Sequence, residues 1–231
     1  MTNQHTGLKE SVEIIHAKAL LMSDENNNGT SNGQPEDPDL LALLGSRLCH
    51  DLVNPIGAIG NGLELLEMAP GDGKAEMALM RESLNAAMAR IKFFRVAFGA
   101  GADDAMIAAR DMRTTLDEMY GQSRTRVVWR DDAERSRHEM RLACLALTCI
   151  EVATPWGATI EVVRNEAAWV IHVDAKRLRI DEPLWQSLGR GILPPDLKGS
   201  EVQFGILARL ARRLRRPVSV SADETHLSLI V

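Results

Sequence analysis

The longest regular pattern in the chain is a run of apolar residues spaced three or four apart between residues 39 and 68. Its members are Leu41, Leu44, Leu48, Leu52, Ile56, Ile59, Leu63 and Leu66. A second run, which alternates steps of three and four like a heptad seam, consists of Met77, Met80, Leu84, Ala87, Ile91, Phe94 and Phe98. The segment APGDG at 69–73 separates the two runs, so the pattern predicts an antiparallel helical hairpin. A single hairpin cannot cover both apolar stripes, and a second copy is expected to complete a four-helix bundle across a two-fold axis.

After residues 99–104 the spacing changes to a mixture of helical and alternating segments. The apolar positions predict helices near 105–121, 138–154, 182–188 and 201–215. The segments ATIEVVR and AWVIHVDA alternate in polarity and predict paired strands, as do PVSVS and THLSLIV near the C-terminus. The predicted fold class is therefore α+β, with the N-terminal hairpin followed by an α/β sandwich.

Composition and charge divide the chain into three parts. Residues 1–38 carry six acidic residues and two lysines, and their polar second half predicts a disordered acidic tail. Residues 39–100 form the predicted hairpin domain, and residues 101–231 the α/β domain. The net charge of the whole chain is -5, so the part after the tail is nearly neutral. This balance argues against a nucleic-acid binder held by a broad positive field.

Neither export nor membrane insertion is indicated, because no apolar run reaches the roughly 18 residues of a membrane-spanning helix and the first residues lack a signal-peptide pattern. The three cysteines, Cys49, Cys144 and Cys149, have spacings that suit neither a zinc site nor a disulfide framework. A cytoplasmic protein without a metal site is expected. Cys144, Cys149, Trp156 and Trp169 are interpreted as core residues.

The first helix carries a candidate site in the stretch SRLCHDLVNPIGAIGNGLELL. His50 lies two residues from both Leu48 and Leu52, or about 200° around the helix axis from each, so it points away from the apolar seam. The surface around it is expected to carry Arg47, Asp51, Asn54, Gly57 and Asn61. A ridge of small and polar residues beside an imidazole allows another protein to approach closely. Pro55 lacks an amide proton for the carbonyl of Asp51 and predicts a bend one turn after His50.

The string CHDLVNP resembles the phosphoacceptor box of the histidine kinase dimerisation and phosphotransfer domain. The longer stretch from Ser46 to Leu66 is similar to the ChpT-type histidine phosphotransferases of bacterial phosphorelays. The resemblance implies that His50 is phosphorylated, that Asp51 is its acid/base or orienting neighbour, and that Asn54 helps to position water for dephosphorylation. Arg47, Gly57 and Asn61 would then contact the partner.

The order of elements after residue 101 resembles the ATP-binding domain of histidine kinases, but the nucleotide motifs are missing. The helix HEMRLACLALTCIEVATPW has no Asn to coordinate Mg²⁺. In HVDAKRLRID only Asp174 remains of the glycine-rich loop, and the stretch from Lys176 to Arg179 fills the space that glycines would open. The sequence therefore predicts neither ATP binding nor autokinase activity.

Taken with this resemblance, the residues predict a homodimeric phosphotransferase that relays a phosphoryl group between receiver-domain aspartates through His50. The resemblance implies a CckA-like hybrid kinase upstream and CtrA-like or CpdR-like regulators downstream, with Mg²⁺ bound by the partner receiver and no tightly bound cofactor. Two alternatives stay open. One is an ATP-dependent histidine kinase, and the other is a non-catalytic scaffold that binds regulators through the arginine-rich helix at 209–216.

Overall fold

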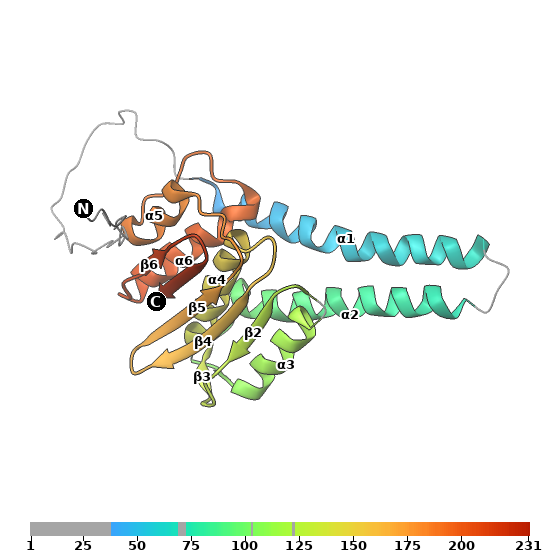
Figure 1. Ribbon diagram of the computed structural model, residues 1–231, viewed down its shortest axis with the longest axis horizontal. Helices are drawn as coiled ribbons and strands as arrows, with labels where there is room; N and C mark the ends of the chain where they lie inside the picture. The colour runs from blue at the N-terminus through green and yellow to red at the C-terminus, as the bar shows by residue number, and fades with distance from the viewer. Residues whose placement is uncertain (1–37, 69–72, 103, 122) are drawn as a thin grey trace, which may run out of the picture.

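The N-terminal part of the computed structural model is a helical hairpin that projects from a compact C-terminal body (Figure 1). The structure describes residues 38–68, 73–102, 104–121 and 123–231, so the expected tail and most of the hairpin loop lie outside the described residues. Helix α1 spans Leu40–Met68 and helix α2 spans Lys74–Ala97, which confirms both predicted helices. The Asp39 carboxylate caps the N-terminus of α1 by accepting hydrogen bonds from the amides of Leu41 and Ala42.

The two helices pack closely along their length. Gly62 is buried, and a Cβ at this position would lie 2.4 Å from Cγ of Met80, so only glycine allows this approach. Helix α1 continues through Pro55, where the missing amide proton leaves the Asp51 carbonyl without its usual helical partner. The proline is therefore accommodated within a single long helix.

The C-terminal body combines a mixed five-stranded sheet with a layer of helices. Its elements are β1 (Met106–Ile107), α3 (Ala109–Tyr120), β2 (Arg126–Trp129), β3 (Arg135–Ser136), α4 (Arg137–Ala153), β4 (Thr159–Asn165), β5 (Ala168–Asp174), α5 (Glu182–Arg190), the 3-10 turn η1 (Gly199–Glu201), α6 (Val202–Arg213), β6 (Ser219–Ala222) and β7 (His226–Ile230). The strand order is β2-β4-β5-β7-β6, and β2 is parallel to β4 while the other pairs are antiparallel.

The predicted strand pairs β4–β5 and β6–β7 are confirmed, as is the α+β class. The expected start of a helix at residue 105 is wrong, because residues 106–107 form β1 and pair with β3 in a separate two-stranded sheet. Burial raises the pKa of the Cys144 and Cys149 thiols, in agreement with their expected place in the core. Trp169 is also a core residue, but Trp156 is exposed and stacks under the Arg177 guanidinium instead.

The hydrophobic core crosses the expected domain boundary at residue 100. Phe93, Phe94 and Ala97 of α2 belong to the same buried cluster as α3 and α4, so the placement of Phe94 in a bundle seam is wrong. The end of α2 is held there because Arg141 of α4 donates a hydrogen bond to the Ala97 carbonyl at 3.1 Å. The first turns of α1 also pack against the body, through Leu40, Leu43 and Leu48.

The outer part of the hairpin keeps a row of exposed apolar side chains, which we call the hairpin stripe. It consists of Val53, Ile56 and Leu63 on α1 and of Met77, Leu84, Met88 and Ile91 on α2. Among the residues described, no helix combines the length and apolar character needed to cross a membrane. The hairpin stripe is therefore apolar surface that the chain by itself leaves open to water.

Candidate functional site

His50 lies on α1, two residues beyond Leu48, which packs on the body. Its side chain is 78% exposed, and Nδ1 lies 3.2 Å from Oδ1 of Asp51. A carboxylate accepts hydrogen bonds, so this contact requires the proton of a neutral imidazole to sit on Nδ1. The lone pair of Nε2 is then available to an incoming electrophile.

Asp51 divides its two oxygens between different partners. Oδ1 faces His50, whereas Oδ2 lies 3.5 Å from Nε of Arg47 and 3.5 Å from a terminal nitrogen of Arg90. Asp51 is half-buried, and Arg90 comes from α2. The carboxylate that orients the imidazole is thus held by one arginine from each helix of the hairpin.

Arg47 does not lie on an exposed ridge, and its expected place is wrong. Its side chain is only 8% exposed, and one terminal nitrogen donates to the Ser200 carbonyl at 2.9 Å and to Oε1 of Gln203 at 2.6 Å. The other terminal nitrogen lies 3.6 Å from Oε2 of Glu151. Arg47 is buried because η1 and α6 pack against the first turns of α1, where they cover its side chain.

The other expected contact residues share an open helix face with His50. Asn54, Gly57 and Asn61 follow His50 in steps of four, three and four, and all are exposed. A Cβ built on Gly57 would meet no atom within 4 Å, so packing within the chain does not require glycine there. Glycine inside a helix costs roughly 0.5–1 kcal/mol relative to alanine. The roles assigned to these residues stay predictions.

Sequence reasoning missed Arg90, Glu151, Gln203 and Tyr120. The Tyr120 hydroxyl donates to Oε1 of Glu151 at 2.9 Å, which links α3 to the contacts of Arg47. Arg90 could have been noticed as a cation beside the apolar seam of the second helix. Glu151 and Gln203 are separated from Arg47 by more than a hundred residues, and no local pattern in the sequence points to them.

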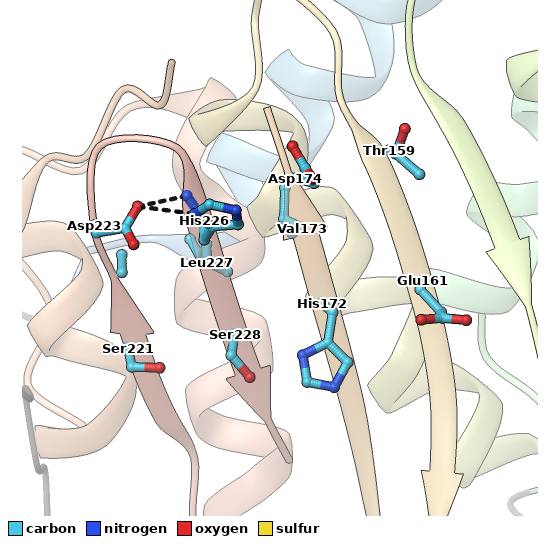
Figure 2. Close-up of a pocket in the computed structure, with 11 residues that line it drawn as sticks. Thr159, Glu161, His172, Val173, Asp174, Ser221, Asp223, His226, Leu227 and Ser228 are labelled. Atoms are coloured by element: carbon cyan, nitrogen blue, oxygen red, sulfur yellow. Dashed lines mark hydrogen bonds and ion pairs between the residues drawn. The ribbon is translucent and has the colours of Figure 1, made fainter. Parts of the chain in front are cut away.

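Asp174, the remnant of the expected nucleotide motif, lines a shallow pocket on the exposed side of β4, β5, β6 and β7 (Figure 2). The pocket has a volume of about 440 Å³. Its polar lining includes Glu161, Asp174 and Asp223, together with His172, His226 and several hydroxyl groups, and none of the described residues that line it is a lysine or an arginine. Three carboxylates make this pocket a poor place for the phosphates of a nucleotide.

The arginine-rich segment at 209–216 has two parts. Arg209, Arg212 and Arg213 are exposed and line a second hollow, of about 350 Å³, beside the end of α5. Arg216 instead pairs with Glu139, which also contacts Arg164 at 2.9 Å. The segment is thus partly a solvated helix face, as the pattern suggested, and partly a structural ion-pair cluster.

The fold of this chain is similar to that of a solved phosphotransferase. A solved bacterial phosphotransferase is 30% identical, and the match covers 83% of this chain and 95% of that one with a TM-score of 0.70. A family model described as the histidine phosphotransferase C-terminal domain matches residues 109–226. The protein phosphotransferase ChpT of Brucella abortus (strain 2308) is 33% identical over 192 residues, which are 80% of this chain and 90% of that protein. The chain belongs to the family of ChpT-type histidine phosphotransferases.

Proposed function

We propose that His50 carries a phosphoryl group between the aspartates of two receiver domains in a cytoplasmic phosphorelay. One observation carries this proposal. The imidazole has Nδ1 held by the Asp51 carboxylate and lies on a helix face that is open to a partner. These are the requirements of a histidine nucleophile, which needs a fixed tautomer and free access to the attacking nitrogen.

The transfer step needs no group beyond the imidazole, Asp51 and the receiver. The Nε2 lone pair attacks phosphorus, an N–P bond forms, and the P–O bond to the donor aspartate breaks with its electron pair returning to the carboxylate. The ring keeps its Nδ1 proton and becomes a cation, which the Asp51 carboxylate stabilises at Oδ1. Transfer to the second receiver reverses these steps and restores the neutral ring.

The receiver would supply the rest of the chemistry. Its metal-bound acidic pocket holds Mg²⁺, which neutralises the oxygens of the transferring group, so this chain contributes mainly position and access. The open face formed by His50, Asn54, Gly57 and Asn61 would contact the receiver, and Asn54 would orient water when phosphate is lost. The family resemblance suggests a CckA-like donor and CtrA-like or CpdR-like acceptors.

The protein would act as a homodimer joined through the hairpin stripe. On α1, Ile56 and Leu63 lie about 120–140° around the helix axis from His50, and Val53, the stripe residue nearest to it, lies about 60° away. A second copy packed on the stripe would therefore bury apolar surface while it leaves both imidazoles open. The resulting four-helix bundle explains why these side chains are apolar although a single chain exposes them.

We also propose that the C-terminal domain has no ATP-dependent kinase activity. In α4, Met140 and every residue from 142 to 150 are buried, so little of this helix remains to line a nucleotide site. Arg177 stacks on Trp156 at 3.4 Å in the segment where a kinase would have flexible glycines. Both features favour a phosphotransferase over the kinase alternative.

The proposal is tested by incubating the full chain with a receiver domain that carries a radiolabelled aspartyl phosphate. We expect acid-labile label on the wild-type chain and none on His50→Gln, whose hairpin stripe is unchanged. His172→Gln is the matched control, because His172 is also exposed but lies on the sheet. Label that persists in His50→Gln, or that is lost in His172→Gln instead, would overturn the assignment.

A further inference from the structure

Arg47 joins the helix of His50 to the C-terminal domain. Each nitrogen of its guanidinium faces a different part of the fold. Nε faces Asp51 on α1, one terminal nitrogen binds Ser200 of η1 and Gln203 of α6, and the other faces Glu151 on α4. The planar fork of arginine can make these contacts at once, which a lysine ammonium cannot do. Arg47 is thus placed between Asp51 and the body.

The anchors of Arg47 in the body are themselves fixed. Gln203 is fully buried, and its amide nitrogen donates to the carbonyls of Thr148 and Ser200 at 3.2 and 2.9 Å, so its Oε1 is turned toward Arg47. Burial, and then the neighbouring Glu151 carboxylate, raises the pKa of Tyr120 well above its usual value. The phenol therefore stays protonated and continues to donate to Glu151.

The position of Asp51 depends on this anchored guanidinium. Oδ2 of Asp51 and Nε of Arg47 are buried, lie 3.5 Å apart, and have no hydrogen-bond partner within the described chain. The other cation near Oδ2 is Arg90, which is more exposed. Without Arg47 the carboxylate would lose its buried counter-charge and could rotate toward water, away from Nδ1 of His50.

We propose that Arg47 is a positioning residue through which the C-terminal domain fixes Asp51 and thereby the tautomer of His50. The inference rests on the proposed role of His50 and adds a task for the domain that lacks nucleotide motifs. This domain holds the orienting carboxylate in place, so an α/β body without kinase activity contributes to phosphotransfer. The contact also keeps the body docked on the first turns of α1.

The first test is the tautomer of His50, measured by NMR of the full chain with ¹⁵N-labelled histidine. We expect the Nδ1–H form to dominate in the wild type and the Nε2–H fraction to rise in Arg47→Gln. Gln203→Met, which removes the anchor of Arg47 at nearly constant volume, should shift the ratio in the same direction. It supplies the test on its own if Arg47→Gln does not fold. Unchanged tautomers in the variants that fold would overturn the proposal.

The second test compares rates of label uptake from the phosphorylated receiver. Arg47→Gln should slow uptake by up to about 100-fold, the loss that a small misplacement of reacting groups can cause. The same change in an Asp51→Asn background should have little further effect, because Arg47 acts through Asp51. Independent, multiplying losses would contradict the proposal.

Arg164→Gln serves as the matched control for stability. Arg164 has a side chain that is 7% exposed and is paired with Glu139, far from His50 in the sequence, and in the described part of the chain its ion pair involves neither Asp51 nor Arg47. This variant should lower the melting temperature and leave both the tautomer and the uptake rate unchanged; a change in either would show that general destabilisation explains the Arg47 effect. The tautomer measurement needs no phosphate, so it remains decisive even if the wild-type chain takes up no label and the proposed function fails.

Discussion

Replacing Leu84 by Glu should split the proposed dimer and leave each chain folded. Leu84 belongs to the hairpin stripe and is 51% exposed in the single chain, so about half of its side chain remains for a partner to cover. Full burial of a leucine contributes about 1.5–3 kcal/mol, which leaves roughly 1 kcal/mol per copy and about 2 kcal/mol for a symmetric pair. Two carboxylates forced into the same interface cost several kcal/mol more. A total above about 4 kcal/mol weakens dimerisation by about a thousandfold.

Leu79→Glu is the matched control for this change. Leu79 is on the same helix and is also 51% exposed, but it lies about 140° around the axis from Leu84 and outside the hairpin stripe. Multi-angle light scattering should give a monomer mass for Leu84→Glu and a dimer mass for Leu79→Glu, with the same circular dichroism for both. A dimer mass for Leu84→Glu, or equal dissociation of the two variants, would refute the proposed bundle.

Three further predictions concern the site and the C-terminal domain. Asn54→Ala should slow phosphate release from a partner receiver by about 2–4 kcal/mol in activation free energy while affecting the labelling of His50 less, and equal losses in the two rates would assign Asn54 to docking instead. Millimolar Mg-ATP should leave the melting temperature unchanged, whereas a rise would revive the kinase alternative. Hydrogen bonds from Arg135 lower the pKa of Asp131 from 3.8. Asp131→Asn should therefore destabilise the protein, and this loss of stability should reach its full size above about pH 4. Because the wild type loses this contribution as the pH falls through the lowered pKa, the gap between the two melting temperatures should close in acid, and a gap that stays constant with pH would contradict the assignment.

The elements of this fold that could be predicted are those encoded by local patterns. The three-and-four spacing predicted α1 and α2, and the alternation of polar and apolar residues predicted the β4–β5 and β6–β7 pairs. The two-residue strands β1 and β3 could not be predicted, because a strand of that length has no period and depends on its partner. Phe94 matched the seam spacing equally well, but its surroundings are set by α4, which lies far along the chain.

The candidate site likewise has features that local spacing predicts and features that depend on distant contacts. The outward direction of His50 and the open face shared with Asn54, Gly57 and Asn61 follow from helix geometry alone. The burial of Arg47 does not, because helical spacing places it next to the open face while η1 and α6 cover it. Contacts between residues more than a hundred positions apart leave no trace in local spacing.

The most direct test of the account is the identity of the phosphorylated atom. The full chain, labelled with ¹⁵N in its histidine rings and phosphorylated by a receiver domain, can be studied by ³¹P and ¹⁵N NMR. The account predicts a single phosphohistidine at His50, with phosphorus bonded to Nε2 and the proton kept on Nδ1 beside Asp51. Phosphorus on Nδ1 of His50, or on any other residue, would contradict it.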